Sequence, residues 1–514
     1  MLDVSFENHG KGSQVVAKDQ TEPNTTDASV QLRDIEAAMA ALEEVVGAAH
    51  ILTEPADKAG YLTDWTGAFS GDALAVVRPS RTAEVSDIVK ICAANGLAIV
   101  PQGGQTGLCG GGVPVAGQAS IILSLARMNA VRSIDLAGRT AVVEAGVVLE
   151  ALHNRVLEEG LIFPLMFGAK SSCTIGGNLS TNAGGSNVVR YGNTRELCLG
   201  IEAVMPDGTI VNALTGLRKD NTGYDLKNLL IGAEGTLGII TAAVFKLYPV
   251  PVTRMTAFLS VSSLAAATGV LNRLQDFSGG AVEAYEYMPR KMVELICMHF
   301  PAIQPTFDPP ADTGVLVEIA SSRASDSELT DDGSTRLTES VMMLLAELME
   351  EGVILDAIIA QSEKQRNDLW QMRESVLEAI TENGPCYHLD LSLPLANIAS
   401  FVEELDPIST SLGFQPLVVG HLGDGNLHYA LSAADGFEWS DLPLDKAKAA
   451  AFDLLTRLNG SFSAEHGIGQ SKLPVMAHLK EPSQLQAMRA IKAALDPKNI
   501  MNPGKFLPLP DVAA

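Results

Sequence analysis

The chain has few positively charged residues and few aromatic residues for its length. Its 514 residues include 36 Lys and Arg against 61 Asp and Glu, so the formal net charge is −25. A surface of this sign repels nucleic-acid phosphates and anionic bilayers, and we expect neither as a partner. A few buried cations can still hold an anionic substrate. With 46% hydrophobic and 19% charged residues, the composition excludes a disordered chain and a coiled coil.

Cysteine is scarce, and long hydrophobic runs are missing. No run of about 18 apolar residues occurs, so we expect no transmembrane helix. Residues 1–30 lack both the apolar core of a secretory signal and the arginines of a transit peptide, which predicts a disordered tail and a cytoplasmic protein. The cysteines form no C-x-x-C pair and predict buried free thiols in a reducing compartment. They are Cys92, Cys109, Cys173, Cys198, Cys297 and Cys386.

The order of apolar patterns predicts a mixed α/β region followed by a second domain. At roughly 150 residues per domain, the length predicts two or three domains. A helix over residues 30–46, a strand at 73–77, a helix over 82–92 and a strand at 98–100 follow one another in β-α-β order. The composition changes at Tyr248-Pro-Val-Pro251. Beyond it the patterns predict a strand at 314–320, a strand-rich segment at 414–431 and helices at 262–276, 336–350, 363–383, 447–458 and 485–495.

Glycine is in excess and is clustered. The 46 glycines are about 9% of the chain against a usual ~7%. They concentrate in three segments, at residues 101–112, 168–192 and 231–241. Such segments are either mobile surface loops or places where backbone N–H groups converge on a phosphate. Three of them beside strand-like sequence favour the second interpretation. No G-x-G-x-x-G or Walker A motif occurs, so neither a Rossmann nor a P-loop nucleotide site is supported.

Three motifs in these segments resemble the FAD-binding segments of the vanillyl-alcohol-oxidase/PCMH superfamily. They are Pro101-x-Gly-Gly-x-Thr-Gly107, Cys173-Thr-Ile-Gly-Gly-Asn178 with Asn182-x-Gly-Gly185, and Gly232-x-Glu-Gly-Thr-Leu-Gly238. The downstream chain resembles the FAD-linked 2-hydroxy-acid dehydrogenases, which include D-lactate and D-2-hydroxyglutarate dehydrogenases and the glycolate oxidase D subunit. The resemblance implies an α+β fold. A PCMH-type FAD-binding domain of two α/β subdomains is expected at 31–250, a substrate cap domain with an antiparallel sheet at 251–460, and a segment returning to the flavin at 461–514.

The resemblance also implies which residues bind the cofactor. The first segment would cradle the FAD pyrophosphate, the second and third would line the adenosine and flavin portions, and a terminal Asn-Pro-Gly would lie near the ring. The expected FAD-binding residues are Pro101, Gly103, Gly104, Gln105, Thr106, Gly107, Gly168, Ser172, Gly176, Gly177, Asn178, Thr181, Asn182, Gly184, Gly185, Tyr191, Gly192, Glu234, Gly235, Gly238, Ile239, Ile240 and Asn502.

A histidine pair near the C-terminus predicts a metal site. His421 and His428 would point to opposite faces of a continuous strand, but the intervening Gly-Asp-Gly is strong turn chemistry that can fold both rings toward one point. Two histidines and a carboxylate are a common set for an open zinc or manganese site, and Glu465 is the best third ligand. The alternative is hydrogen-bonded interior histidines. The resemblance implies that His421, His428 and Glu465 bind the metal and that His466 is the catalytic base.

The expected reaction is oxidation of a 2-hydroxy acid. A metal chelated by the hydroxyl and carboxylate groups lowers the hydroxyl pKa, an imidazole accepts the proton, and hydride leaves C2 for flavin N5. Arg373, on a predicted helix, offers a bidentate fork to the substrate carboxylate. It could instead be a surface residue paired with Glu374 or Glu378. The W-x-x-R-E pattern around it resembles that of the family and favours the substrate role.

Three departures from the family pattern bear on the substrate. Hydroxyglutarate-specific members place a threonine, a lysine and an asparagine where this chain has Leu377, His388 and Ala430. Leucine cannot hydrogen-bond an anion, and His388 is fully charged only below its pKa. We therefore expect Arg373, His388 and His466 to contact a small or apolar acid such as D-lactate in preference to D-2-hydroxyglutarate.

Two other functions are compatible with the glycine segments. One is a metal-free flavin oxidase of alcohols or phenols, which the histidine pair disfavours. The other is a non-catalytic electron-transfer subunit, which His466 and Arg373 disfavour. The electron acceptor would be a quinone, an electron-transfer flavoprotein or a cytochrome, and a homodimer is possible on general grounds.

Overall fold

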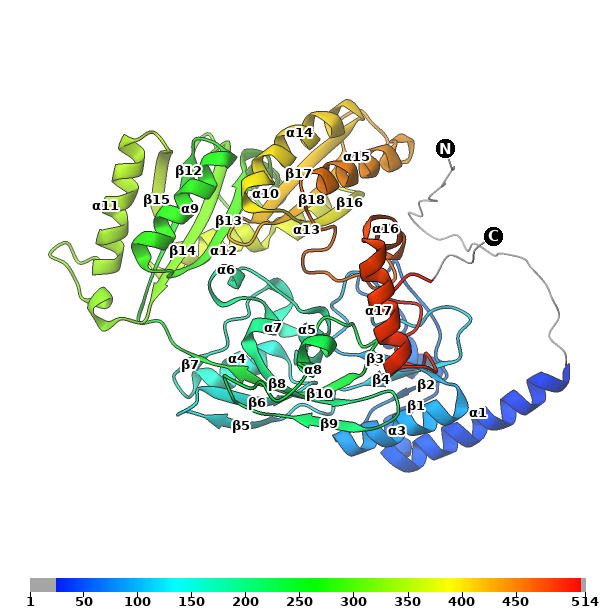
Figure 1. Ribbon diagram of the computed structural model, residues 1–514. Coiled ribbons are helices and arrows are strands. Elements are labelled where there is room, and N and C mark those ends of the chain that lie inside the picture. The colour runs from blue at the N-terminus through cyan, green and yellow to red at the C-terminus, as the bar shows by residue number, and fades with distance from the viewer. Residues whose placement is uncertain (1–24, 510–514) are drawn as a thin grey trace. The chain divides into compact units, whose positions relative to one another are not determined.

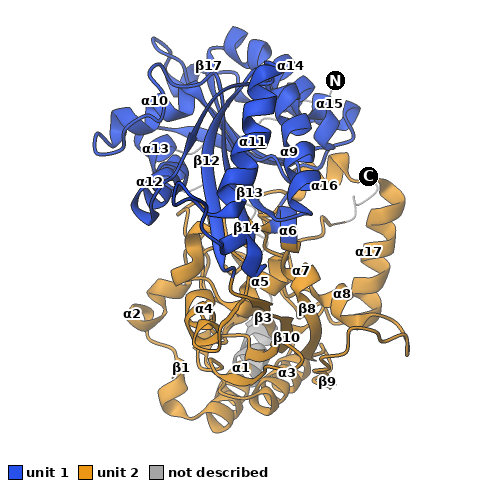
Figure 2. Cartoon of the chain, turned by 90° about the vertical axis from the view of Figure 1, so that its left-hand side faces the viewer, with its two compact units in different colours: residues 1–24, 188–190, 251–464 blue, residues 25–187, 191–250, 465–514 orange. Residues whose placement is uncertain are grey.

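The computed structural model describes residues 25–509, and side chains from residue 35 onward. Residues 1–24, which make up most of the tail predicted over 1–30, lie outside the described range. The described chain divides into two compact units, shown blue and orange in Figure 2. Unit 1 consists of residues 188–190 and 251–464. Unit 2 consists of residues 25–187, 191–250 and 465–514, described as far as residue 509.

The first sheet of unit 2 has four strands in the order β1-β2-β4-β3. β4 pairs in parallel with β2 and β3, while β1 pairs with β2 antiparallel. Helices α1 and α3 pack apolar residues such as Leu42 and Ile88 against these strands (Figure 1). The bounds are α1 (Thr25–Val46), β1 (Ile51–Leu52), β2 (Ala75–Val77), α3 (Thr82–Asn95), β3 (Ala98–Gln102) and β4 (Ser120–Ser124).

The predicted helices and strands of this region are confirmed, with one correction. α1 begins at Thr25 rather than at residue 30, so residues 25–30 of the expected tail are helical. The helix was not predicted over these residues because they are mostly polar. The apolar spacing that indicates an amphipathic helix begins only after them. α3 ends at Gly96, whose φ of +65° is the left-handed conformation that glycine adopts easily.

The second sheet of unit 2 has five antiparallel strands in the order β5-β6-β10-β8-β9. Pro206-Asp-Gly208 forms the turn between β8 and β9, and Gly208 has the positive φ of +84° that such a tight turn uses. Helices α4 and α5 pack on this sheet. The bounds are β5 (Val131–Asp135), β6 (Thr140–Glu144), α4 (Leu149–Leu157), α5 (Ile175–Thr181), β8 (Cys198–Val204), β9 (Ile210–Ala213) and β10 (Ile239–Lys246).

Unit 1 is built on one seven-stranded antiparallel sheet in the order β15-β12-β14-β13-β17-β18-β16. Both faces are covered by helices, so its central strands β13 and β14 are almost entirely buried. The strand bounds are β12 (Thr253–Val261), β13 (Val282–Pro289), β14 (Thr313–Ser321), β15 (Ile354–Ile359), β16 (Cys386–Ser392), β17 (Phe414–His421) and β18 (Asn426–Ala433).

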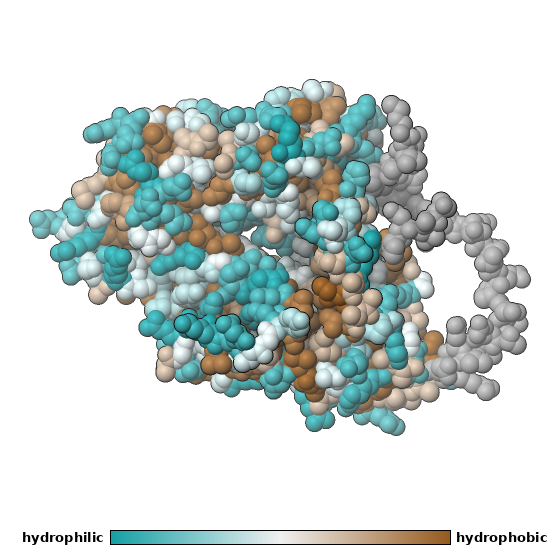
Figure 3. Space-filling model, viewed as in Figure 1, coloured by the Kyte–Doolittle hydropathy of each residue, from teal (hydrophilic) through white to brown (hydrophobic). Residues whose placement is uncertain are grey.

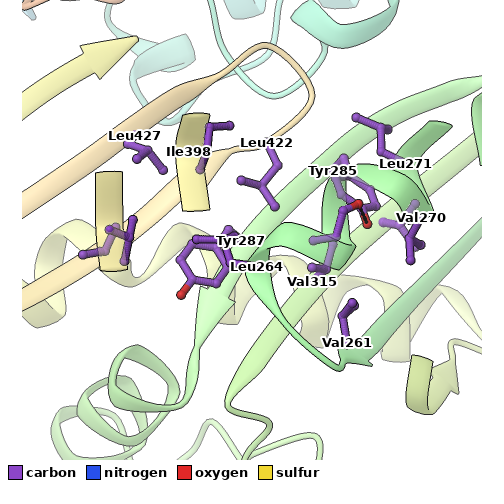
Figure 4. Packing of buried hydrophobic residues seen from close by; sticks show 14 of the residues in the cluster. Val261, Leu264, Val270, Leu271, Tyr285, Tyr287, Val315, Ile398, Leu422 and Leu427 are labelled. Atoms are coloured by element: carbon purple, nitrogen blue, oxygen red, sulfur yellow. Dashed lines mark hydrogen bonds between the residues drawn. The ribbon is translucent and has the colours of Figure 1, made fainter. Parts of the chain in front are cut away.

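The two faces of this sheet bear different helices. On one face, Tyr285, Tyr287 and Val315 pack against α9 (Leu264–Ser278), α11 (Arg336–Glu350), α14 (Ile398–Ser411) and α15 (Leu444–Arg457). Figure 4 shows part of this core, where Val270 and Leu271 lie close to Tyr285. On the other face, Met288, Leu316 and Val419 pack against α10 (Arg290–His299), α12 (Glu363–Glu374) and α13 (Val376–Glu382). Because side chains alternate along a strand, the residues between these tyrosines and valines belong to the second face.

Unit 1 corrects one predicted helix and confirms the others. The helix expected over 363–383 is two helices, α12 and α13, separated at Ser375. The Ser375 hydroxyl donates to the carbonyl of Gln371, and such local bonds favour a break. Unit 2 has mixed and antiparallel sheets with helices, and unit 1 has a large antiparallel sheet covered by helices, so the α+β fold class is confirmed.

All six cysteines are free, as expected. Four are buried, but Cys297 and Cys386 are only half-buried, which corrects the expectation for those two. Cys386 begins β16, the outermost strand of its sheet, where neighbours cover one side only. Among residues 25–509 no helix has the length and apolar character needed to cross a membrane. Figure 3 shows hydrophilic residues over much of the visible face, interrupted by small hydrophobic areas.

Candidate active site

The three glycine segments meet within unit 2. A Cβ on Gly104 would lie 2.0 Å from the carbonyl oxygen of Ser172, so the first and second segments touch backbone to backbone. The third segment donates to α5 of the second, since the N–H of Glu234 bonds to the carbonyl of Ser180 at 2.8 Å. A Cβ on Gly235 would lie 3.0 Å from Cγ of Pro101, which brings the third segment against the first.

Asn502 joins the C-terminal segment to the same cluster. Its backbone N–H donates to Ile99 at 2.8 Å, so the chain runs beside β3. Its side-chain amide donates to the carbonyls of Gly111 at 3.0 Å and Glu234 at 2.8 Å. Four stretches far apart in sequence, each expected to contact the cofactor, are therefore neighbours in one unit.

The remaining expected cofactor residues lie on these same stretches. Gly168 opens a short 3-10 helix (Gly168–Ser171) that Ser172 follows, and Asn182 ends α5 with a positive φ of 52°. Pro101 is in β3, and Gly103, Gly104, Gln105, Thr106 and Gly107 form the loop after it. α5 carries Gly176, Gly177, Asn178 and Thr181, and Gly184 and Gly185 follow it. Tyr191 is the last residue of α6 (Val188–Tyr191), and Gly192 follows it. Gly238 immediately precedes Ile239 and Ile240, which begin β10.

The backbone of this cluster fits a large ligand. A Cβ on Gly107 or Gly168 would meet no atom within 4 Å among the described residues, so these positions face open space. Close by, a Cβ on Gly103 would lie 2.4 Å from Oγ1 of Thr174. That hydroxyl oxygen is buried and has no hydrogen-bond partner within the described part of the chain. A buried polar atom beside an open glycine backbone is the expected feature of a cofactor cradle.

The carboxylate of Glu234 is engaged within the protein. Its two oxygens accept hydrogen bonds from the N–H groups of Ile468 at 2.7 Å and Gly469 at 2.8 Å. Burial raises the pKa of Glu234, and these two bonds only partly offset it. Beneath it, Lys505 donates to the Asn502 side chain at 2.6 Å, and burial lowers the pKa of Lys505 to about 7. Glu234 thus anchors the loop that follows His466.

The same loop is also tied to the first glycine segment. The Gln470 side chain donates to the carbonyls of Gly110 at 2.8 Å and Val113 at 3.1 Å. At the start of this loop, Oε1 of Glu465 lies 3.7 Å from Nε2 of His466. Unit 2 therefore holds the expected base and the expected third metal ligand side by side, on a loop fixed to the first and third glycine segments.

His421 and His428 come together in unit 1, as the turn between them predicts. β17 and β18 form a hairpin, and Gly425 in its turn has a φ of +85°. The register pairs His428 with Val419, so both histidines project from the same face of the sheet. Their ring centroids are 5.3 Å apart at 85°, and a nitrogen of one lies within 4.8 Å of a nitrogen of the other.

Asp390 is a potential ligand that the sequence reasoning missed. It pairs with His428 across β16 and β18, and one of its oxygens lies within 4.8 Å of a His428 nitrogen. It is buried and accepts from the Asn426 side chain at 3.1 Å and from the N–H of Ala464 at 3.2 Å. Its signal in the sequence is a carboxylate inside the apolar strand Leu389-Asp-Leu391. His428 therefore has two potential co-ligands on this sheet face, His421 in one side-chain contact and Asp390 in another.

Arg373 lies on the same face of the sheet. Its Nε donates to Oε2 of Glu286 at 2.9 Å, not to Glu374 or Glu378, and its side chain is 13% exposed. Its two terminal nitrogens have no hydrogen-bond partner among residues 35–509. A guanidinium held by Nε presents its terminal N–H groups as a fork for a carboxylate.

A second buried carboxylate fixes the helix that carries Arg373. Glu318 on β14 accepts from Arg366 through Nε at 2.7 Å and Nη2 at 2.8 Å, and from the Trp370 indole at 2.9 Å. Burial alone would raise the pKa of Glu318, but the hydrogen bonds and charge of Arg366 outweigh it and hold this pKa below its usual value. α12 is thus anchored one turn before Arg373.

Of the three positions expected to determine the substrate, two are exposed and one is buried. Leu377 on α13 is 44% exposed. His388 on β16 is exposed, and its Nε2 lies 3.1 Å from Sγ of Cys386. Ala430 is buried against α12 and α13 in the core of this face.

Comparison with known proteins assigns the family. The FAD binding domain model matches residues 73–214, and the C-terminal domain model of FAD linked oxidases matches residues 250–506. D-2-hydroxyglutarate dehydrogenase of Bos taurus is 39% identical over 91% of this chain and 83% of its own length. The protein of that name from Xanthomonas citri pv. viticola is 34% identical over 90% and 96%, and a putative D-lactate dehydrogenase of Schizosaccharomyces pombe is 34% identical over 88% and 86%.

Solved structures agree on the fold. p-Cresol methylhydroxylase with substrate bound superposes with a TM-score of 0.69, at 15% identity over 93% of this chain and 97% of that one. A 4-ethylphenol oxidase from Gulosibacter chungangensis gives a TM-score of 0.68, at 18% identity over 93% and 98%. At these identities the likeness concerns architecture alone.

The chain belongs to the FAD-linked oxidase family. Within that family it groups with the FAD-dependent D-2-hydroxy-acid dehydrogenases, which confirms the resemblance and the class of enzyme inferred from the motifs. FAD as cofactor is confirmed by the matched FAD-binding domain.

Proposed function

We propose that this protein oxidises a D-2-hydroxy acid to the 2-oxo acid, and that it prefers a small or apolar acid such as D-lactate to D-2-hydroxyglutarate. The observation that carries the proposal is the face of the unit 1 sheet, where a half-paired guanidinium, Arg373, shares its buried carboxylate partner with His421. A hydroxy acid that chelates a metal needs two binding groups: a cation for its carboxylate, and a metal, here held by the histidine pair, for its hydroxyl group.

We propose His421, His428 and Glu465 as ligands of a divalent metal, zinc or manganese. Glu465 belongs to unit 2, but the chain leads directly to it from Ala464, whose N–H is bound to Asp390 in unit 1. This direct connection along the chain supports Glu465 as the third ligand. Asp390 would orient His428 or bind the metal itself. The metal, when bound, would lower the pKa of the substrate hydroxyl.

The other groups of the protein would each have a separate role in the reaction. The terminal N–H groups of Arg373 would hold the substrate carboxylate. Nε2 of His466, the nitrogen 3.7 Å from Oε1 of the proposed ligand Glu465, would accept the hydroxyl proton as hydride leaves C2. The glycine segments and Asn502 would hold FAD, which supplies the hydride acceptor. The electrons would pass on to a quinone, an electron-transfer flavoprotein or a cytochrome.

The substrate preference is supported by what the chain offers to a second carboxylate. Leu377 has no polar atom in its side chain, and the imidazole of His388 contacts the Cys386 thiol. Neither supplies the permanent cation that a distal carboxylate needs at neutral pH. The free cysteines support a reducing compartment, and we propose a cytoplasmic location.

Anaerobic flavin reduction across D- and L-2-hydroxy acids tests the proposal. We expect D-lactate to bleach the flavin absorbance with a higher kcat/KM than D-2-hydroxyglutarate, and the L-acids to leave it unchanged. A preference for D-2-hydroxyglutarate would refute the substrate assignment alone. No reduction by any 2-hydroxy acid would refute the reaction. Chelation should abolish reduction and zinc or manganese should restore it, whereas Glu465→Gln should lose the metal and keep FAD.

A further inference from the structure

Glu286 is a buried carboxylate that neither the motifs nor the proposed reaction accounts for. It lies in the middle of the buried strand β13, which also carries Glu283, and its side chain is 0% exposed. Each of its oxygens has a different partner: Oε2 accepts from Nε of Arg373 at 2.9 Å, and Oε1 bonds to Nδ1 of His421 at 2.8 Å. Burial of a carboxylate is costly unless both oxygens are satisfied in this way.

The backbone places Glu286 and His421 opposite each other. They are directly paired residues in the β13–β17 register, so their side chains leave the sheet together on one face. Since a carboxylate only accepts, Nδ1 of His421 must carry the hydrogen. The other ring nitrogen, Nε2, is then the one with a lone pair for a metal. Glu286 therefore selects the ring orientation and tautomer that a histidine ligand requires.

The hydrogen bond between Glu286 and Arg373 likewise fixes the orientation of the Arg373 guanidinium. It uses Nε and leaves the two terminal nitrogens without a partner among residues 35–509. The charge of Glu286 compensates the charge of Arg373 inside the protein, and the remaining N–H groups keep a fixed direction. Burial alone would raise the pKa of Glu286, but His421 and Arg373 hold it below its usual value.

We infer that Glu286 is a positioning residue that couples the substrate clamp to the metal site, by holding Arg373 with one oxygen and His421 with the other. The inference rests on the proposed function, because it takes His421 as a metal ligand and Arg373 as the carboxylate clamp. It adds that the two are set by a single group, so that one change at Glu286 disturbs both metal affinity and substrate binding.

Glu318 provides a matched control. It is as deeply buried, lies on the neighbouring strand β14 and holds an arginine of the same helix, α12. Its hydrogen-bond partners include Arg366, Trp370 and Thr256, and none of these three is a proposed ligand or clamp. If buried carboxylates on this sheet act only by keeping the fold, Glu286→Gln and Glu318→Gln should behave alike.

The test compares Glu286→Gln, Glu318→Gln and the unaltered protein, each as the purified flavoprotein. Zinc is removed by chelation, and its affinity is then measured by competition with a chromophoric chelator. We expect Glu286→Gln to bind zinc ~10–100-fold more weakly, the range seen when a group behind a metal-bound histidine is changed. Glu318→Gln should bind zinc as the unaltered protein does. After zinc is restored to saturation, Glu286→Gln should also show a larger rise in KM for D-lactate than fall in kcat.

Unchanged zinc affinity in Glu286→Gln would overturn the inference, as would an equal loss in Glu318→Gln. If Glu286→Gln does not fold, Glu286→Asp is measured instead. It keeps the charge but is one methylene shorter, so it cannot reach both partners and should weaken zinc binding, raise the KM for D-lactate, or both. The absence of both effects would overturn the inference.

If the unaltered protein itself binds no zinc or manganese, the proposed metal site fails and the inference fails with it. If it binds metal and oxidises D-lactate while Glu286→Gln is unaffected, only the inference fails.

Discussion

The candidate sites of the two units are built from different parts of the chain, backbone in one unit and side chains in the other. In unit 2 the candidate cofactor site is made of backbone: Gly103, Gly104 and Gly235 allow segments to touch, and Gly107 faces open space. In unit 1 the site is made of side chains that project from neighbouring strands of a rigid sheet, with Glu286, His421, His428 and Asp390 on β13, β17, β18 and β16. A backbone site is damaged by adding atoms, and a side-chain site by removing them.

The largest effect is expected at His466, on the loop of unit 2 that contacts the first and third glycine segments. His466→Ala should retain FAD, because the loop stays held by Glu234 and Gln470, but should lower kcat by ~10²–10⁴ through loss of the proton acceptor. Flavin content by absorbance and steady-state turnover measure the two separately. The exposed His478, on α16 (Leu473–Leu479), gives a control in His478→Ala, which should turn over normally. Wild-type turnover in His466→Ala would contradict the assigned role.

The next effect concerns stability in unit 1. Glu318→Gln removes one partner of a buried ion pair and should lower the free energy of unfolding by about 3–5 kcal/mol, measured by urea denaturation. The folded pKa of Glu318 lies below its unfolded value of 4.5, so its contribution is present above pH 4.5 and is lost as pH falls through the lower folded value. The variant should therefore show a weaker loss of stability on acidification. An unchanged acid profile would show that Arg366 does not depress this pKa.

A pair of glycine substitutions sharpens the contrast in unit 2. Gly104→Ala places a methyl group 2.0 Å from the Ser172 oxygen and should destabilise the protein by about 1–3 kcal/mol and lose FAD. Gly107→Ala adds the same methyl group into open space, so the apoprotein should keep its thermal stability. Its FAD affinity should nevertheless fall if the open space belongs to the cofactor. Equal thermal stability of the two apoproteins would remove the steric basis of the comparison.

The smallest effect concerns specificity on the sheet face. The double change Leu377→Thr and His388→Lys supplies a hydrogen-bond donor and a permanent cation, and should raise kcat/KM for D-2-hydroxyglutarate relative to D-lactate about tenfold, or 1.4 kcal/mol. Leu377→Ile, which adds no polar atom, is the control. A double variant with the ratio of the unaltered protein would mean that these positions do not contact the distal carboxylate.

Features that depend on the local backbone could be predicted from the sequence, whereas features that depend on distant partners could not. Glycine motifs and the Gly-Asp-Gly turn act through the local backbone, so the glycine segments and the meeting of His421 with His428 could be predicted. Glu286 and Asp390 are carboxylates within buried strands, and their partners lie 135 and 38 residues away along the chain. The sequence around each of them does not indicate which distant residue it faces. The break at Ser375 was missed because the apolar pattern continues across it.

The glycine motifs were sufficient to predict the family, the FAD cofactor and the class of enzyme through their resemblance to known proteins, and the histidine–turn–histidine pattern was sufficient to predict that His421 and His428 meet, because these features depend on residue type and short-range geometry. Only the tertiary structure decided the partners of Glu286: strand pairing places it opposite His421, and the packing of α12 on the sheet brings Arg373 to it rather than to its neighbours on the helix. The reason is physical: a buried charge takes the partner that the register brings within reach, and register is a property of strands that are distant in sequence.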